Sequence, residues 1–331
     1  MTPTPPAGDA AQALRDLVAA GRFADALRTF RELDGPSVRR RPELLLLAAT
    51  AATRVGDLDT ARSLAEAALA GFRSRGDRDG RMRALNLLGV IGFEQGRLGD
   101  AEEAFRGALS LARELGDSLL VARASNNLAS LSHIRGRAND ALSLFRGALL
   151  AYQRLGDRRG AAETYHNLGL AFRGMAELAE AEGASAEAVR HAELVGESAL
   201  LALTVTGRAE VHVDAGEIGL AEREVAHAIR LAQSADDALG IAEARRIGAR
   251  AALKRRDFAG AIREAEAAGT IAAQHGAAVL QADSAAVLAL ALRASGSPAA
   301  EEHRNQVLAS YRSLGADPLI VRFEREWEEL G

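Results

Sequence analysis

The sequence contains no cysteine, which excludes disulfides, thiolate zinc sites and cysteine nucleophiles together. This absence is typical of proteins in a reducing compartment, and we expect a cytoplasmic location. Lysine occurs once, at Lys254, so arginine supplies nearly all of the positive charge. The net charge of −4 gives no general attraction to nucleic acid or to anionic lipid.

Long apolar runs, aromatic residues and strand-like patterns are also scarce. The run "LLLLAATAA" at residues 44–52 is too short for a membrane-spanning helix, which needs about 18 apolar residues. Aromatic residues make up 4% of the chain, and β-branched alternation is limited to "LTVTGRAEVHV" at residues 203–213. Leucine, alanine, arginine and glutamate dominate instead, so we predict an all-α protein. Residues 1–8 lack the features of a signal peptide and are predicted to be a disordered tail.

Patterns that carry catalytic chemistry are absent from the sequence. The seven histidines form no HExxH motif, and no two of them share a helix face at metal-binding spacing. No nucleophile elbow and no phosphate-binding glycine loop occur. The basic clusters at residues 39–41 and 254–256 have no interleaved aromatic residues. We therefore predict a protein that is not an enzyme, holds no cofactor or metal, and does not bind nucleic acid or membranes.

What the sequence does contain is a period of forty residues. Seven positions at this spacing read Gly56, Gly96, Gly136, Ala176, Gly216, Arg256 and Gly296. Five residues after each of the first six lies an alanine, and seven residues before each of the seven lies a glycine or alanine. Such small residues let two helices approach closely where they cross. The two residues that replace glycine, Ala176 and Arg256, predict locally altered turns that keep the phase.

A second series of glycines lies twenty residues out of phase. It reads Gly76, Gly116, Gly156, Gly196 and Gly276, with Asp236 at the remaining position. Glycine ends a helix by adopting left-handed backbone geometry, and a following aspartate can begin the next helix. Two helix ends every forty residues predict antiparallel helix pairs. We expect one solenoid over residues 9–331, with eight pairs at about 9–35, 38–76, 78–116, 118–156, 158–196, 197–236, 238–276 and 277–315, and a capping helix at 317–330.

The pattern G-x-[FL]-x-x-A, with a small residue seven positions before the glycine, resembles the tetratricopeptide repeat (TPR). The forty-residue period, together with "NNLA" at 126–129 and "HNLG" at 166–169, is similar to the longer variant of kinesin light chains and of bacterial regulator sensors. The resemblance covers residues 42–315 and is strongest over 78–195. It implies a right-handed superhelix whose first helices line a concave groove.

The same resemblance implies which positions face that groove, namely those thirteen, ten, nine, six, three and two residues before each turn. The candidates for partner binding are Arg83, Asn86, Arg123, Asn126, Asn127, His133, His166, Asn167, Arg173, Glu210, Arg246 and Arg250. Asn127 and Asn167 occupy equivalent positions, where in peptide-binding TPRs an asparagine holds the peptide backbone. The alternative is that these side chains bond to neighbouring helices or water, and that Arg123 pairs with Glu163.

Groove positions in the second half carry charges of both signs. The pair that ends at Gly216 offers Glu210 and Asp214, whereas the pair that ends at Arg256 offers Arg246 and Arg250. These charges indicate either a charged partner or a solvated groove. The functional prediction is an adaptor that binds a peptide or protein segment in the groove. The alternatives are a structural subunit that uses its convex face or termini, and a sensor that acts on a separately encoded output protein.

Overall fold

The structure is a computed structural model that describes residues 7–33 and 41–330. Over these ranges the chain forms helices and no strand, so the all-α prediction is confirmed. The chain divides into two compact units, Met1–Ala124 and Ser125–Gly331, which we call unit 1 and unit 2. Whether they form one continuous solenoid, as the sequence predicts, stays a prediction. Most of the predicted tail, residues 1–6, lies outside the described residues.

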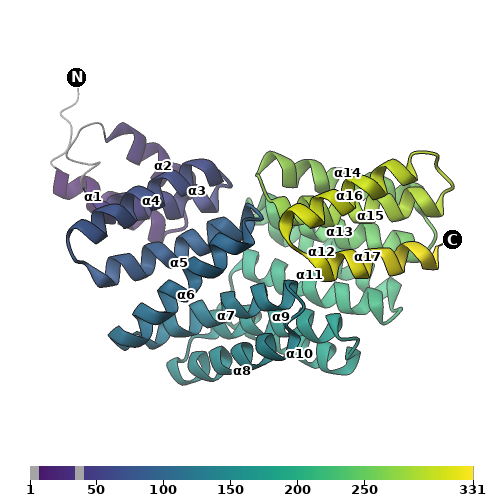
Figure 1. Ribbon diagram of the computed structural model, residues 1–331, viewed down its shortest axis with the longest axis horizontal. Helices are drawn as coiled ribbons and strands as arrows, with labels where there is room; N and C mark the ends of the chain where they lie inside the picture. Colours follow the sequence, from purple (N-terminus) through teal and green to yellow (C-terminus); the bar gives the residue numbers. More distant parts are fainter. Residues whose placement is uncertain (1–6, 34–40, 331) are drawn as a thin grey trace. The chain divides into compact units, whose positions relative to one another are not determined.

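Unit 1 contains the first six helices and the start of a seventh, coloured purple to teal in Figure 1. They are α1 (Ala7–Ala19), α2 (Phe23–Glu32), α3 (Pro42–Arg54), α4 (Leu58–Ser74), α5 (Arg78–Glu94), α6 (Leu98–Leu115) and α7 (Ser118–Ile134), of which α7 continues into unit 2. Consecutive helices pack as antiparallel pairs, as the two glycine series predict.

Unit 2 continues the same alternation. Its helices are α8 (Ala138–Leu155), α9 (Arg158–Gly174), α10 (Leu178–Val195), α11 (Ser198–Asp214), α12 (Ile218–Ser234), α13 (Ala238–Lys254), α14 (Phe258–Gln274), α15 (Ala278–Ala294), α16 (Ala300–Leu314) and α17 (Asp317–Glu329). The stretch at residues 203–213, which has some strand character in the sequence, lies inside α11. Eight helix pairs and one final helix therefore occupy the described residues, as predicted.

The turns follow the two predicted series. Every glycine of both series has a positive φ, from 64° to 80°. The three other residues at series positions adopt the same left-handed geometry, with φ of 62° at Ala176, 51° at Asp236 and 66° at Arg256. The prediction of locally altered turns at Ala176 and Arg256 is therefore wrong. The helix packing on both sides keeps the turn, and these residues bear the strain of a left-handed backbone.

Aspartates begin several of the helices. The side chains of Asp77, Asp117 and Asp157 each accept a hydrogen bond from the backbone N–H three residues later, at 2.8–2.9 Å. Two of these turns also hold an aromatic ring from the preceding pair, because Phe72 lies where a Cβ of Gly80 would be and Tyr152 lies where a Cβ of Gly160 would be. In these two turns the aspartate of the sequence D-x-x-G caps the helix, and the glycine leaves room for an aromatic ring.

The small residues that flank each turn lie in the helix crossings. All six alanines five residues after the turns are completely buried, and so are the alanines seven residues before them. In unit 2, for example, Ala129 of α7 and Ala141 of α8 share a cluster with Phe145 and Leu168. Close helix approach at small residues therefore forms the core, as the sequence predicts.

Candidate functional site

The first helices of successive pairs lie side by side in unit 2. The imidazole of His133 on α7 lies against Gly174 on α9, at 2.7 Å from where a glycine Cβ would stand. The imidazole of His166 on α9 lies against Gly207 on α11 in the same way. We call the surface that these helices share the first-helix face. It carries the predicted residues Asn126, Asn127, His133, His166, Asn167, Arg173, Glu210, Arg246 and Arg250, together with Asp214.

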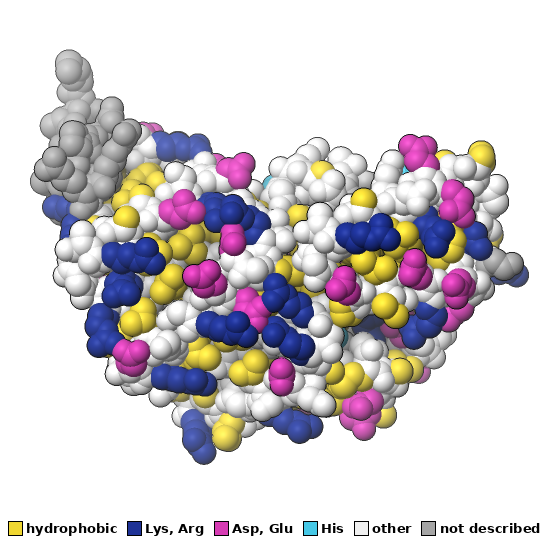
Figure 2. Space-filling model, viewed as in Figure 1, with side chains coloured by type: hydrophobic (Ala, Val, Ile, Leu, Met, Phe, Trp, Pro, Cys, Tyr) yellow, Lys and Arg dark blue, Asp and Glu magenta, His cyan; other side chains and the backbone are white. Residues whose placement is uncertain are grey.

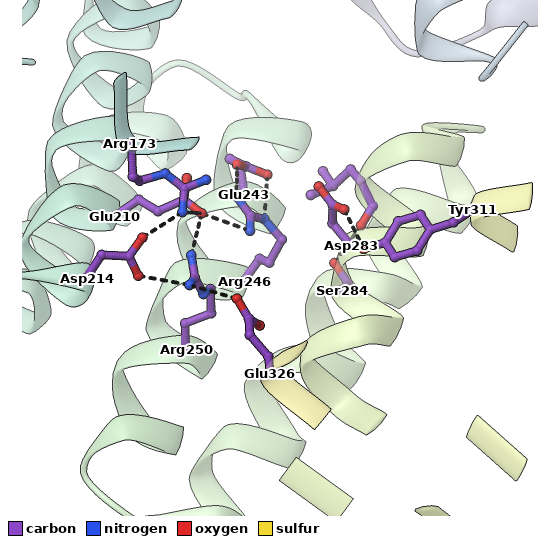
Figure 3. Close-up of polar contacts among 11 residues, drawn as sticks. Arg173, Glu210, Asp214, Glu243, Arg246, Arg250, Asp283, Ser284, Tyr311 and Glu326 are labelled. Carbon is purple, nitrogen blue, oxygen red and sulfur yellow. Dashed lines mark hydrogen bonds and ion pairs between the residues drawn. The ribbon is translucent and has the colours of Figure 1, made fainter. Parts of the chain in front are cut away.

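A cluster of opposite charges occupies this face between α9, α11 and α13 (Figure 3). The Glu210 carboxylate lies at its centre, 3.3 Å from Arg173, 3.2 Å from Arg246 and 2.8 Å from Arg250. Asp214 bonds to Arg173 and Arg250, each at 2.9 Å. The exposed fractions of the Arg173, Glu210 and Arg246 side chains are 8%, 3% and 6%.

The charged side chains of this cluster pair with one another. Burial alone would raise the pKa of Glu210, but Arg173, Arg246 and Arg250 outweigh it and hold that pKa well below its ordinary value. Glu210 is therefore ionised at neutral pH. One donor of the cluster, Arg173 Nε, is buried without a hydrogen-bond partner among the described residues.

Both predicted histidines are neutral at pH 7. Burial, together with the neighbouring charges of Arg173 and Arg322, lowers the pKa of His133 to about 4 against the attraction of Glu210. Burial also lowers the pKa of His166 to about 4, again against the attraction of Glu210. A neutral imidazole can donate one hydrogen bond and accept another, so these side chains contribute polarity without charge.

The asparagines meet across α7 and α9. Asn167 Nδ2 donates to Asn126 Oδ1 at 3.4 Å, so the contact joins Asn167 to the residue before its sequence equivalent. Asn126 is buried, whereas Asn127 and Asn167 are half-buried. Glu163, the alternative partner expected for Arg123, bonds to Arg159 on its own helix at 3.1 Å. A pair between Arg123 of unit 1 and Glu163 of unit 2 stays a prediction.

The remaining predicted residues belong to unit 1. Arg83 is exposed and forms an ion pair with Asp79 of the same helix at 3.0 Å. Asn86 is half-buried and Arg123 is exposed. The first-helix face is defined from unit 2 alone, and the participation of these three residues in binding stays a prediction.

Sequence reasoning missed the part that α17 plays at this site. Glu326 of α17 lies 3.8 Å from Arg250, and Ile134 of α7 packs in the same apolar cluster as Phe323. The sequence offered one signal, an amphipathic segment at 317–330 that carries the single tryptophan. It gave no indication that this segment would reach back to α7.

A second buried polar contact lies between α11 and α12 and involves His212. Its side chain is buried, and Nδ1 lies 2.8 Å from Glu224, which in turn accepts a bond from Arg208 at 2.7 Å. This pair joins α11 to α12 within one helix pair. His212 Nε2 also lies 3.7 Å from Glu182 of α10, so this buried side chain connects neighbouring helices.

Two other kinds of site are not found in the described ranges. No group of three or more histidine, aspartate or glutamate side chains there is arranged to hold a metal ion. Likewise, none of the helices in the described part of the chain combines the length and the apolar character that crossing a membrane requires. Arginines and acidic side chains are interspersed on the surface drawn in Figure 2.

The fold and the first-helix face define an α-solenoid of helix pairs, a class that works mainly by binding other proteins. Residues 41–114 and 120–193 match the family described as "Tetratricopeptide repeat". The resemblance noted in the sequence is therefore confirmed over these residues. A comparison with curated proteins finds no match to this chain.

Solved structures share this fold. A Rap protein complexed with competence and sporulation factor has a TM-score of 0.66 at 13% identity, with 98% of this chain and 96% of that chain covered. The Rap conjugation regulator of plasmid pLS20, in complex with the Phr* peptide, has a TM-score of 0.70 at 18% identity, with 82% and 74% covered. A signal-transduction ATPase of Pyrococcus horikoshii with a tetratricopeptide repeat sensor has a TM-score of 0.54 at 14% identity, and the match covers 97% of this chain and 48% of that chain.

Proposed function

We propose that this protein is a non-enzymatic cytoplasmic adaptor that binds a peptide or protein segment on the first-helix face of unit 2. The observation that carries the proposal is the contact between Asn126 and Asn167, which joins carboxamides from two neighbouring first helices beside a charged cluster. A carboxamide offers two donors and one acceptor, which match the N–H and C=O of an extended chain.

The geometry of that contact supports exchange with a ligand. Its distance of 3.4 Å is near the limit of hydrogen bonding, so the bond is weak. A peptide backbone that offers shorter bonds would replace it at small cost. Asn127 lies half-buried next to Asn126 and adds a third carboxamide to the same part of the face.

The similar structures support the kind of ligand. Two of the Rap proteins were solved with a competence and sporulation factor and with the Phr* peptide. Their identities to this chain, 13% and 18%, carry the fold alone, so the peptide-binding role is our proposal for this chain.

A titration tests the proposal. The immobilised full chain captures its partner from a lysate, mass spectrometry identifies that partner, and the purified partner is then titrated against Asn127→Ala/Asn167→Ala. Each lost hydrogen bond is worth about 0.5–1.5 kcal/mol, so the double variant should bind about 5- to 150-fold more weakly. Asn305→Ala, at an exposed position of α16, is the matched control and should bind as the unchanged protein does. Equal affinity of the double variant and the control would refute the proposal.

One observation favours the alternative of a structural subunit. Leu150 and Leu155 of α8 and Leu194 of α10 are each about half exposed, at 49%, 48% and 52%. Exposed leucines on second helices can contribute to an interface in a larger assembly. Under this alternative, Leu155→Arg would abolish partner binding, whereas the double asparagine variant would bind normally.

A further inference from the structure

The last helix, α17, has two unlike sides, one packed against the rest of unit 2 and one exposed. Its apolar side buries Phe323 and Trp327 in one cluster with residues of α15 and α16. Leu319 and Ile320 pack against the same cluster, so the apolar stripe runs along the helix at the usual spacing. Val321, on the opposite side, is 69% exposed.

The position of α17 differs from that of a simple end cap. Pro318 Cγ lies 2.8 Å from where a Cβ of Gly136 would be, at the turn between α7 and α8. Ile134 of α7 and Leu253 of α13 pack against the apolar cluster of α17. Helix α17 thus contacts the first-helix face at α7 and at α13, and it also packs against α15 and α16.

Arginines surround α17 on the surface that it covers. Arg304 lies 3.7 Å from Glu324, and Arg250 lies 3.8 Å from Glu326. The guanidinium carbons of Arg293 and Arg304 lie 4.6 and 5.5 Å from the centre of the Trp327 ring. The helix itself is acidic, with five acidic residues and two arginines between Asp317 and Glu329.

Most of these contacts could be made by another helix of the same kind. The two ion pairs are long and partly solvated, so they select for negative charge without fixing a single geometry. The one short bond, from Arg293 Nε to the Trp327 carbonyl at 2.9 Å, goes to the backbone. Unpaired carbonyls are present at the C-terminal end of every helix. What remains specific is the pair of aromatic side chains four positions apart, Phe323 and Trp327.

A short connection joins α17 to the rest of the chain. Gly315 ends α16 with a φ of 63°, and only Ala316 separates it from α17. Rotation about this short connection would move α17 as a rigid helix away from the arginines. The surface beneath it would then expose the apolar cluster and the charged cluster around Glu210 together.

We propose that the surface under α17 is a docking site for an acidic amphipathic helix of a partner protein, which carries two aromatic residues four positions apart and takes the place of α17. This inference goes beyond the proposed function, since a helix pairs its own backbone groups and would not use the asparagine carboxamides that hold an extended segment. Because α17 is tethered, its effective concentration is in the millimolar range for a short linker, and the partner helix must compete with it.

The test uses a fluorescein-labelled peptide of residues 316–330 as a probe of this chemistry. Phe323→Ala in the full chain removes one aromatic anchor from α17 and leaves the arginine surface unchanged. The lone Trp327 reports release of α17 in this variant as a shift of its emission to longer wavelength. Fluorescence anisotropy should then give at least about tenfold tighter peptide binding to Phe323→Ala than to the unchanged protein, because the apparent affinity follows the fraction of open sites.

Two controls sharpen the result. Val321→Ala, on the exposed side of α17, should leave both Trp327 emission and peptide binding unchanged. A peptide with lysine in place of its five acidic residues should not bind the Phe323→Ala variant. Binding of this reversed peptide with equal affinity would show that charge does not select the helix, and would overturn the proposal.

Other outcomes also separate this inference from the proposed function. If Phe323→Ala releases Trp327 yet binds no peptide, the surface is not a helix-docking site. The proposed function would still be supported in that case if the double asparagine variant bound its partner more weakly. If the variant instead forms a dimer that buries Trp327 and excludes the peptide, the occupant is a second copy of this chain and the proposal is wrong.

Discussion

Arg250 Nη1 donates a hydrogen bond to Glu210 Oε1 at 2.8 Å, between residues forty positions apart on the neighbouring helices α13 and α11. One full repeat period thus separates the two charges. The pair shows that opposite charges in successive repeats can satisfy each other across the first-helix face. The same Glu210 oxygen also lies within 3.3 Å of Arg173 and Arg246, so a single carboxylate joins three arginines.

Glu210→Gln should destabilise the protein by about 3 kcal/mol, the lower end of the range for breaking a buried ion pair. The lower end applies because Asp214 still pairs with Arg173 and Arg250, and Glu243 still pairs with Arg246. Urea denaturation at pH 7 measures the change. Glu266→Gln, at an exposed position of α14, is the control and should change stability by less than about 0.5 kcal/mol. A Glu210→Gln protein as stable as this control would contradict the account of the cluster.

Stability should fall as the pH drops from about 6.5 toward 4. Each buried histidine has a pKa of about 4 in the folded chain, below its ordinary value of 6.5. The unfolded chain therefore binds protons over this range that the folded chain does not, which favours unfolding. The expected loss between pH 7 and pH 5 is roughly 2 kcal/mol for each histidine.

His166→Gln should reduce the loss of folding stability between pH 7 and pH 5 by the contribution of one histidine, roughly 2 kcal/mol. Paired urea denaturations at the two pH values measure it. His227→Gln, at an exposed position of α12, should leave the difference unchanged. If His166→Gln and His227→Gln gave the same pH dependence, His166 would not be the buried neutral side chain described above.

Arg256→Gly should stabilise the protein by about 0.5–1 kcal/mol. Arg256 has a φ of 66°, and a side chain in this left-handed region costs about 1–2 kcal/mol, which exceeds the entropy that glycine adds to the unfolded chain. The neighbouring Arg255 has a φ of −80°, so Arg255→Gly should destabilise the protein instead. Thermal melting of the two variants checks the opposite signs, and a loss of stability in both would contradict the argument.

Ala141→Leu should destabilise unit 2 by about 1–3 kcal/mol, since overpacking forces neighbouring side chains from their preferred rotamers. Ala141 is completely buried, in a cluster with Ala129 and Phe145. Ala226→Leu, at an exposed position of α12, should change stability by less than about 0.5 kcal/mol. The melting temperatures of the two proteins compare these effects, and equal values would show that Ala141 is not in a tight crossing.

The helices and turns could be read from the sequence because each repeat specifies them locally. A glycine that ends a helix and an aspartate that begins the next act within a few residues, and forty-residue spacing repeats the signal. The exceptions at Ala176 and Arg256 were misjudged for the same reason, since a purely local argument misses that packing on both sides can hold a residue in left-handed geometry.

The candidate site was less predictable, because it depends on contacts between residues far apart. Counting back from each turn identified residues that lie together in unit 2. The same counting could not predict that Glu210 pairs with arginines of both neighbouring helices. Nor did it indicate Glu326, since the sequence of α17 does not follow the forty-residue pattern from which groove positions were inferred.

The aromatic rings that pack against the first turns of α5 and α9 affect how cooperatively neighbouring helix pairs unfold. Phe72 links the end of one pair to the first turn of the next at Gly80, and Tyr152 does the same at Gly160. In a repeat array, the strength of such nearest-neighbour links decides whether pairs unfold singly or as a block. Where a ring bridges two pairs, local opening of one would expose the ring and uncap the other. Amide protons on the two sides of each ring should therefore exchange with solvent together, as members of one opening unit.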